Sequence, residues 1–309
     1  MNRQIHTVSI IGMGALGVLY ASRISEHLPK TNLRVIADQS RIDRYEAEGL
    51  YCNDKRCDFQ YVLPKTKSDP ADLVIFAVKF RDLQDAISVA RNQIGPDTII
   101  ISLLNGIISE EIIAETYGMN QIVFCVAQGM DAVKMGNKLT YHQMGELCFG
   151  TYPKGAPTDQ VLRVADFLDR MQVPYSVKED MAKHLWGKFM LNVGVNQTVA
   201  VYRGNYGTIQ REGEACETMI AAMKEAIRIS ESEGTGLCES DLTYWLNILD
   251  TLNPEGMPSL RQDTLANRPT EVGLFAGTVL ALAKKHGMDT PVNQMLYDRI
   301  TEIEQSYGK

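Results

Sequence analysis

The sequence predicts an α/β domain with a parallel sheet, followed by an all-helical domain. In the first half of the chain, short runs rich in Val, Ile and Leu alternate with amphipathic segments, as is typical of parallel strands with helices on both faces. After Tyr175 the apolar residues recur only at the helical period. A length of 309 residues suffices for two domains. We therefore expect a boundary near residues 176–180, between domains of residues 1–178 and 179–309.

Six segments are expected to be strands because they are short, apolar and mostly rich in β-branched residues. They are Thr7–Ile11, Leu33–Ala37, Leu73–Val78, Thr98–Leu104, Ile122–Ala127 and the more polar Leu147–Thr151. Helices are expected between most of these strands, for example at Ala15–Ile24 and Leu83–Asn92.

Four longer helices are expected in the second half, where apolar residues recur every three or four positions. They are Met181–Val201, Glu214–Glu233, Asp241–Leu252 and Thr270–His286. The last of them also has start and stop signals. Pro269 suits a first helical position, Lys284, Lys285 and His286 lie in the last turn, and Gly287 is a natural residue after the helix.

Composition and charge exclude several classes of protein. With 31 basic and 38 acidic residues the net charge is −7, which argues against a nucleic-acid partner. We expect no membrane partner, because no run approaches the roughly 18 uncharged apolar residues that a membrane helix needs. The N-terminus shows no export signal and the six cysteines are scattered, so a reduced, cytoplasmic setting is expected. No metal site is expected, since His and Cys form no cluster with ligand spacing.

A glycine-rich motif lies between the first expected strand and the first expected helix. Its residues are Gly12, Met13, Gly14, Ala15, Leu16 and Gly17, which have the G-x-G-x-x-G spacing. The first glycine permits a tight turn, the second lets the backbone approach a pyrophosphate, and the third allows close packing of helix on strand. The unpaired amides at the helix N-terminus can bind the anion. The motif predicts a Rossmann-type domain that binds a dinucleotide.

The residues after the second expected strand bear on the choice between NAD and NADP. Asp38 lies about 20 residues after the motif, where an acidic residue binds the ribose 2′-hydroxyl in NAD sites. Its charge would repel the 2′-phosphate of NADP, whereas Arg41 and Arg44 could attract one. The choice leans to NAD. The alternative is that all three are solvated loop charges.

A polar stripe crosses the apolar helix expected at Met181–Val201. Lys188, Asn192 and Asn196 recur every four residues and therefore share one face. If that face borders a cleft, the ammonium can polarise or protonate a carbonyl oxygen while the amides orient the substrate. The alternative is a solvent-facing stripe on a helix that is buried only on its other side.

Three further places contain candidate site residues. Asn105 and Gly106 follow an expected strand at the end where α/β proteins bind ligands, although the pair is equally typical of a plain turn. Ser259 and Asp263 are four residues apart and share a face if their segment is helical. Glu271 falls in the first turn of the last expected helix, where interaction with the helix dipole is the alternative to a role in catalysis.

Taken together, these motifs resemble the ketopantoate reductase (2-dehydropantoate 2-reductase) family over nearly the whole chain. The resemblance rests on the order and spacing of several short segments. They are GMGALG at residues 12–17, Val78-Lys79, LLNG ending at Gly106, Trp186 with the Lys188 stripe, Ser259–Glu271, His286-Gly287 and Thr290–Asn293.

The resemblance implies a Rossmann domain, a helical domain and an active site in the cleft between them. In this family NADPH reduces the 2-keto group of ketopantoate to give pantoate, for pantothenate and coenzyme A synthesis. Lys188 is implied to donate the proton and Glu271 to assist it. Residues 12–17, Lys79 and Asn105 are implied to bind the cofactor, NADP or NAD, and the spacing after the glycine motif adds Asp38 and Arg41 to this set. Asn105, Asn192, Asn196, Ser259 and Asp263 are implied to bind the 2-keto acid. A homodimer is plausible.

The sequence departs from the usual family pattern at three positions. Asp38 stands where Arg is usual, Asp82 where Gln is common, and Ala276 where Asn is frequent. These changes leave other activities open. One is that of an NAD-dependent D-2-hydroxyacid dehydrogenase of the same family, acting on another 2-keto acid. Others are a β-hydroxyacid dehydrogenase on the same architecture and a dinucleotide-sensing protein without turnover.

Overall fold

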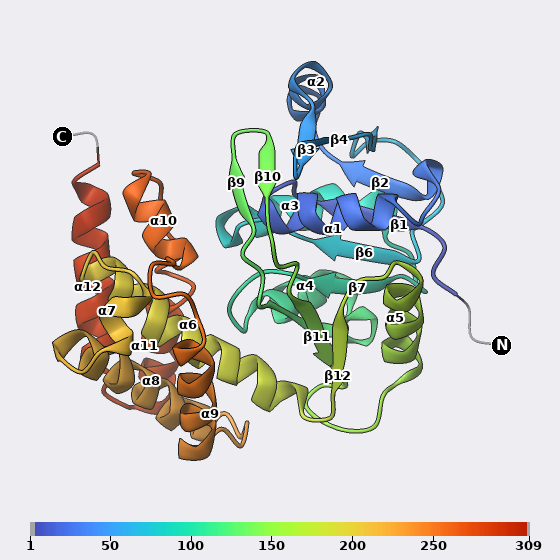
Figure 1. Cartoon of the computed structure of the whole chain (residues 1–309). Coiled ribbons are helices and arrows are strands. Elements are labelled where there is room, and N and C mark those ends of the chain that lie inside the picture. The colour runs from blue at the N-terminus through green and yellow to red at the C-terminus, as the bar shows by residue number, and fades with distance from the viewer. Residues whose placement is uncertain (1–3, 308–309) are drawn as a thin grey trace. The chain divides into compact units, whose positions relative to one another are not determined.

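The computed structural model describes residues 4–307, and the chain divides into two compact units, Met1–Met181 and Ala182–Lys309 (Figure 1). The first unit combines a parallel sheet with helices, and the described part of the second contains helices without strands. This confirms the predicted fold class.

The main sheet of the first unit has five parallel strands in the order β5-β2-β1-β6-β7. Their bounds are β1 Val8–Ile11, β2 Leu33–Ile36, β5 Gln60–Val62, β6 Leu73–Phe76 and β7 Ile99–Ser102. Every residue of β1, β6 and β7 is buried. Apolar side chains on both faces of these strands explain why the runs are continuous rather than alternating.

The strand order reverses at β1. The chain passes from β1 to β2 and β5 on one side, and then returns to β6 and β7 on the other. In an open α/β sheet, ligands bind outside the carboxyl ends of the strands at such a reversal. The segments that follow β1 and β6 are therefore the expected ligand-binding edge of this unit.

Two smaller sheets complete the first unit, in the orders β4-β3-β10-β9 and β12-β11-β8. Their strands are β3 Leu50–Cys52, β4 Lys55–Cys57, β8 Phe124–Gln128, β9 Val133–Met135, β10 Lys138–Thr140, β11 Glu146–Gly150 and β12 Tyr175–Lys178. The expected strand Ile122–Ala127 begins two residues late. It is joined to the main sheet by a bridge from Ile122 to Ile100, and as β8 it pairs antiparallel with β11.

The expectation that no strand lies beyond Tyr175 is wrong. Strand β12 (Tyr175–Lys178) ends at the last residue of the predicted first domain and pairs in parallel with β11, from Tyr175 opposite Leu147 to Lys178 opposite Gly150. Its residues are only partly buried, so they lack the apolar run that marks the strands of the main sheet. Pairing with β11 supplies the backbone hydrogen bonds that the local sequence does not predict.

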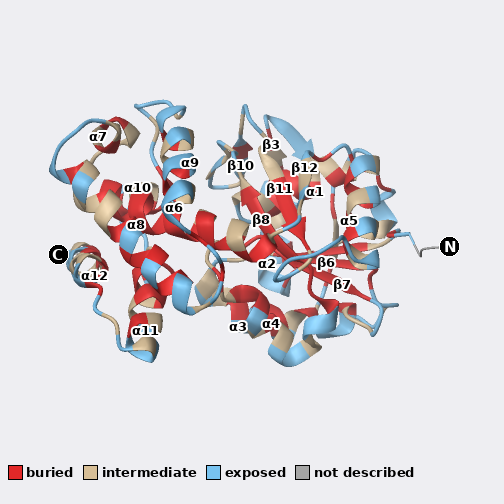
Figure 2. Ribbon diagram, turned by 90° about the horizontal axis from the view of Figure 1, so that it is seen from below, coloured by how far each residue is buried: buried red, intermediate tan, exposed pale blue. Residues whose placement is uncertain are grey.

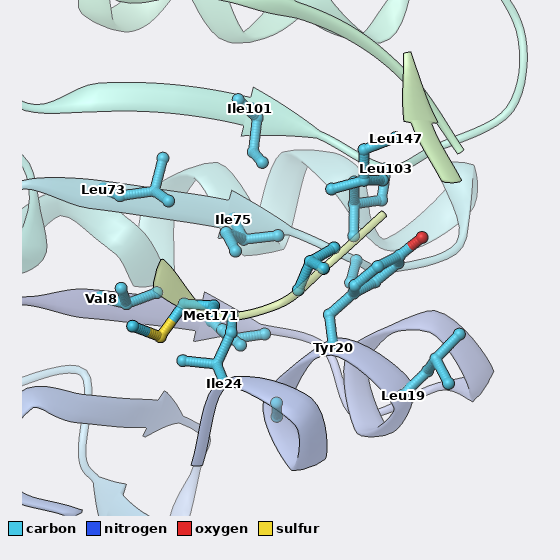
Figure 3. Close-up of a cluster of buried hydrophobic side chains, with 14 of the residues drawn as sticks. Val8, Leu19, Tyr20, Ile24, Leu73, Ile75, Ile101, Leu103, Leu147 and Met171 are labelled. Carbon is cyan, nitrogen blue, oxygen red and sulfur yellow. The ribbon is translucent and has the colours of Figure 1, made fainter. Parts of the chain in front are cut away.

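Helices and short 3₁₀ turns connect the strands of the first unit. The helices are α1 Ala15–Ser25, α2 Gln39–Glu48, α3 Leu83–Ala90, α4 Ser109–Tyr117 and α5 Asp159–Arg170. The 3₁₀ turns are η1 Lys30–Asn32, η2 Phe80–Asp82, η3 Arg91–Gln93 and η4 Met119–Gln121. Helix α1 packs its buried face, with Tyr20 and Ile24, against side chains of the sheet such as Val8, Ile75 and Ile101 (Figure 3).

The described part of the second unit, up to residue 307, is built of seven helices. They are α6 Met181–Val201, α7 Tyr206–Gln210, α8 Glu214–Ser232, α9 Glu239–Asp250, α10 Ser259–Leu265, α11 Ala276–His286 and α12 Pro291–Gln305. Helix α6 is buried along most of its length (Figure 2). A Cβ at Gly187 would collide with Trp245 of α9, and one at Gly194 would collide with Met223 of α8. These glycines let two helices pack closely on α6, which offsets their low helix propensity.

The predicted start of the helix expected at Thr270–His286 is wrong. Helix α11 begins at Ala276 rather than at Thr270, and residues 271–275 form a turn in which the amides of Leu274 and Phe275 donate to the carbonyl of Glu271. The reason is a contact from far along the chain: Oε1 of Gln197 accepts the amide of Ala276 at 3.0 Å. The predicted end is confirmed, since Gly287 follows His286 in the left-handed conformation.

Candidate functional site

The glycine turn after β1 requires two of its glycines for steric reasons. Gly12 has φ +98°, and a Cβ on it would lie 2.6 Å from the carbonyl oxygen of Ala77. A Cβ on Gly17 would collide with the carbonyl oxygen of Gly12. The turn therefore packs directly on the segment that follows β6, while Met13 points into the hydrophobic core.

Gly14 has a different explanation. A Cβ there would meet no atom closer than the carbonyl oxygen of Ala77 at 3.7 Å, so nothing in the described chain requires glycine. Gly14 is also the N-cap of α1. Because glycine has no side chain, no side-chain cap bonds the amides of the first turn, which begins with Ala15 and Leu16. A helix N-terminus with open space beside it suits a pyrophosphate, because its amides and the helix dipole attract an anion. The geometry fits the dinucleotide that the sequence predicts.

Asp38 lies two residues beyond β2 and is the N-cap of α2. Its Oδ1 accepts the amide of Arg41 at 2.9 Å, and its Oδ2 lies 3.4 Å from the Arg41 guanidinium. The side chains of both residues are about half exposed, at 54% and 56%. The carboxylate therefore has a structural role as a cap and still presents its charge at the end of β2.

Lys79 and Asn105 follow the next two strands of the sheet. Lys79 comes three residues after the end of β6 and is exposed. In the turn that follows, Oδ2 of Asp82 lies 3.8 Å from Nε of Arg81. Asn105 comes three residues after β7, is half-buried, and precedes Gly106 with φ +91°. The glycine turn, Lys79 and Asn105 thus follow three adjacent parallel strands, at the edge where the strand order reverses.

A buried chain of hydrogen bonds supports the Asn105 turn. The amide of Leu104 donates to Ser102 Oγ at 3.3 Å, the hydroxyls of Ser102 and Ser109 lie 2.8 Å apart, and Ser109 donates to Glu110 Oε2 at 2.7 Å. Burial raises the pKa of Glu110 to about 7, and the Ser109 hydroxyl and the Cys125 amide oppose the shift. This titratable group therefore lies next to the segment that carries Asn105.

In the second unit the polar stripe lies on α6, as the periodicity predicts. Lys188 is half-buried, and Asn192 and Asn196 are each only 7% exposed. The two asparagines therefore do not form a solvent-facing stripe. Nδ2 of Asn192 is buried and has no hydrogen-bond partner among residues 4–307. A buried donor without a partner costs about 1–3 kcal/mol, which an acceptor atom on a ligand would offset.

The remaining predicted residues occupy α10 and the turn before α11. Ser259 is the exposed first residue of α10, and Asp263 lies four residues later on the same helix. Asp263 is buried and its Oδ1 lies 2.9 Å from two nitrogens of Arg268, so an ion pair holds it. Glu271 is half-buried in the turn rather than in the first turn of a helix, and the helix-dipole explanation for this residue is therefore wrong.

Sequence reasoning missed a buried polar network behind these residues. Gln197 and Asn293 are fully buried, Glu225 is 4% exposed, and hydrogen bonds join the three side chains. The sequence signal was a polar residue at an otherwise apolar position of a helix, which does not by itself identify partners about 70 or more residues away. In the described part of the chain, no group of three or more His, Cys, Asp or Glu residues could hold a metal ion. Nor is any described helix long and apolar enough to cross a membrane.

Two family descriptions match this chain. "Ketopantoate reductase PanE/ApbA" matches residues 8–154, and "Ketopantoate reductase PanE/ApbA C terminal" matches residues 180–304. The chain belongs to the ketopantoate reductase family. It is therefore an enzyme of an NAD(P)-dependent oxidoreductase family. A 2-dehydropantoate 2-reductase from Yersinia pestis is 25% identical over 314 residues, covering 98% of this chain and 96% of that protein.

Solved structures share the fold at lower identity. D-mandelate dehydrogenase in complex with NADH superposes with a TM-score of 0.86 at 20% identity, covering 97% of this chain and 99% of that one. A dimeric ketopantoate reductase from Staphylococcus aureus has a TM-score of 0.78 at 20% identity, covering 98% and 100% of the two chains. Identity this low establishes the fold alone, so the homodimer expected for this chain stays a prediction.

The protonation of Glu110 predicts how stability depends on pH. Its pKa is raised above the ordinary value of 4.5 in the folded state, so folding is favoured by protonation. This contribution is fully present below pH 4.5 and is lost as the pH rises through about 7. A shift of this size corresponds to about 3 kcal/mol. Glu110→Gln should remove that part of the pH dependence, as measured by urea unfolding between pH 5 and 8.

The neighbouring variant Glu111→Gln is the matched control, because Glu111 is exposed on the same helix. It should retain the wild-type pH dependence. Equal slopes of unfolding free energy against pH for wild type and Glu110→Gln would contradict the assignment.

Proposed function

We propose that this enzyme reduces the 2-keto group of ketopantoate to the hydroxyl group of pantoate, with NADPH or NADH as the reductant. The observation that supports this most strongly is the stripe of Lys188, Asn192 and Asn196 on α6. The helix is otherwise apolar and largely buried, yet it carries an ammonium and two buried amides on one face. Asn192 Nδ2, a donor without a partner among the described residues, is what a site for an oxygen-rich substrate requires.

We assign the cofactor to residues 1–178 and the groups that bind the substrate to residues 179–309, which are the two domains predicted from the sequence. The amides of the glycine turn would bind the pyrophosphate, and Asp38, Arg41, Lys79 and Asn105 lie at the ends of the neighbouring strands. When bound, the dinucleotide supplies the hydride. The residues of the protein bind and orient the reactants and supply the proton.

Lys188 is the proposed proton donor. Reduction of a ketone places negative charge on the carbonyl oxygen, and an ammonium group beside that oxygen stabilises the charge and then transfers a proton to it. Glu271 is the proposed partner of Lys188. A carboxylate near an ammonium favours its charged form, so it would keep Lys188 protonated at neutral pH.

The substrate would be held by polar side chains of the second unit. Asn192 can donate Nδ2–H to a substrate oxygen, and Asn196 lies one helical turn further along the same face. Ser259 offers an exposed hydroxyl for the substrate carboxylate. Asp263, held by Arg268, shares the face of α10 with Ser259 and fixes the end of that helix.

A second candidate is an NAD-dependent D-2-hydroxyacid dehydrogenase that acts on another 2-keto acid. It is favoured by Asp38, whose charge at the end of β2 disfavours a 2′-phosphate, and by the similarity to D-mandelate dehydrogenase bound to NADH. The two candidates share the proton donor and differ in the side group of the substrate and in the cofactor. A protein that only senses dinucleotides would not need the stripe on α6.

The first test is a panel of branched and aromatic 2-keto acids with NADPH and with NADH. Ketopantoate should give the highest kcat/KM, and Lys188→Met should lower that value by about 10²–10⁴-fold because the proton donor is lost. Lys183→Met is the matched control, because Lys183 lies on the same helix and forms an ion pair with Asp241 at 3.1 Å. This variant should keep the wild-type kcat/KM. Full activity of Lys188→Met would refute the assignment of the acid.

The panel also separates the alternatives. Preference for an aromatic or another branched 2-keto acid would identify the second candidate. Oxidation of a 3-hydroxy acid would indicate a β-hydroxyacid dehydrogenase. Tight cofactor binding without turnover of any compound would indicate a sensor.

The second test concerns cofactor choice. Asp38→Asn removes the charge but keeps an oxygen that can accept the Arg41 amide, because Asn is an equally good N-cap. The ratio of kcat/KM for NADH to that for NADPH should fall by about tenfold, which corresponds to 1.4 kcal/mol. Asp43→Asn, another exposed carboxylate on α2, should leave the ratio unchanged. An unaltered ratio in Asp38→Asn would show that Asp38 does not face the ribose.

A further inference from the structure

We propose that Gln197 is a positioning residue that holds the turn carrying Glu271 against the helix carrying Lys188. The inference rests on the proposed function, in which Lys188 and Glu271 act as a pair. It assigns to a buried side chain outside the predicted site the task of fixing the geometry of that pair.

The side-chain amide of Gln197 bonds to two different helices, one through its NH2 group and one through its carbonyl oxygen. Its Nε2 donates to the carbonyl of Val193 within α6 at 2.7 Å, and its Oε1 accepts the amide of Ala276 at 3.0 Å. Gln197 is fully buried, as is Ala276. The side chain therefore joins the backbone of α6 to the first residue of α11, at a place where water cannot substitute for either bond.

The bond to Ala276 fixes the position of Glu271 because the intervening turn is closed by its own hydrogen bonds. The amides of Leu274 and Phe275 donate to the Glu271 carbonyl, and the amide of Gly277 donates to the carbonyl of Val272 at 3.0 Å. A shift of Ala276 relative to α6 would therefore carry the whole turn with it.

The other end of the turn is attached to a different helix. The amide of Thr270 donates to Oε1 of Glu304 on α12 at 2.6 Å. The turn thus has one attachment to α12 before Glu271 and one to α6 after it. The second attachment connects it to the helix that carries Lys188.

A second layer of buried polar groups orients Gln197. Oδ1 of Asn293 lies 3.4 Å from Gln197 Nε2, and Nδ2 of Asn293 donates to Glu225 Oε2 at 2.8 Å. Glu225 also accepts the amides of Val292 and Asn293 in the first turn of α12. Each member of the network has hydrogen-bond partners, which is the condition under which buried polar groups make a structure more rigid.

The experiment uses the full-length enzyme and three variants. Gln197→Met keeps the length and volume of the side chain but removes the acceptor for Ala276. Gln197→Glu keeps an acceptor at that position and, as the neutral acid that full burial favours, can still donate a hydrogen bond to the carbonyl of Val193. Thr198→Val is the matched control, since Thr198 is the next residue of α6, is fully buried, and has a hydroxyl without a hydrogen-bond partner among the described residues.

Gln197→Met should lower kcat by about 10–100-fold while KM for the cofactor stays unchanged. The reason is that a displacement of Glu271 by about 1 Å slows the chemical step but does not alter the cofactor site. The alkaline limb of its pH–activity profile should also shift to lower pH. The reason is that Lys188 loses the carboxylate that favours its protonated form. Gln197→Glu should recover most of kcat, and Thr198→Val should match the wild type in both kcat and pH profile.

The outcomes separate this inference from the proposed function. If the wild type reduces no 2-keto acid, the proposed function fails. If the wild type is active and Gln197→Met equals Thr198→Val in kcat and pH profile, the positioning role is refuted. Equal loss of activity in Gln197→Met and Gln197→Glu, with an unshifted pH profile in both, would also refute it, because that pattern indicates a general structural defect. Circular dichroism confirms that each variant is folded before its kinetics are interpreted.

Discussion

The burial of helix α6 is the constraint on which the second unit depends. A helix that is apolar on nearly all sides must be covered on nearly all sides, and α8 and α9 approach it closely at Gly194 and Gly187. Under this constraint a polar side chain on α6 can find a hydrogen-bond partner only within the protein or on a ligand, because water cannot supply one. Gln197 finds its partners in α6 itself and in α11, whereas Asn192 keeps a donor that has no partner in the part of the chain that the structure describes. The bonds of Gln197 indicate a structural role, whereas the open donor of Asn192 supports the proposal that this amide contacts the substrate.

A comparable distinction holds among the glycines of the first unit. Gly12 and Gly17 are required by contacts within the protein, since a side chain at either would collide with the backbone of the turn or of the segment after β6. Gly14 is not required by any such contact. The space beside Gly14 supports the proposal that a pyrophosphate approaches the N-terminus of α1, where glycine leaves room for it.

The sequence predicts those parts of the structure that local pattern determines. The buried strands of the main sheet, the glycine motif and the stripe on α6 were recognisable because each has a period or spacing that follows from backbone geometry. The short strand β12 was missed because its residues are only partly buried, and it exists through pairing with β11. The start of α11 was wrong because Gln197, 79 residues away, accepts the amide of Ala276. Contacts between distant residues of this kind leave no periodic signal.

The central claim is that hydride is delivered to the 2-keto carbon of an acid bound beside Lys188. The most direct measurement is turnover of ketopantoate with the nicotinamide cofactor deuterated at the transferred position, followed by mass spectrometry and NMR of the product. The account predicts one deuterium, bonded to C2 of a 2-hydroxy acid of a single configuration. Cofactor oxidation that leaves C2 without deuterium, or a racemic product, would contradict it.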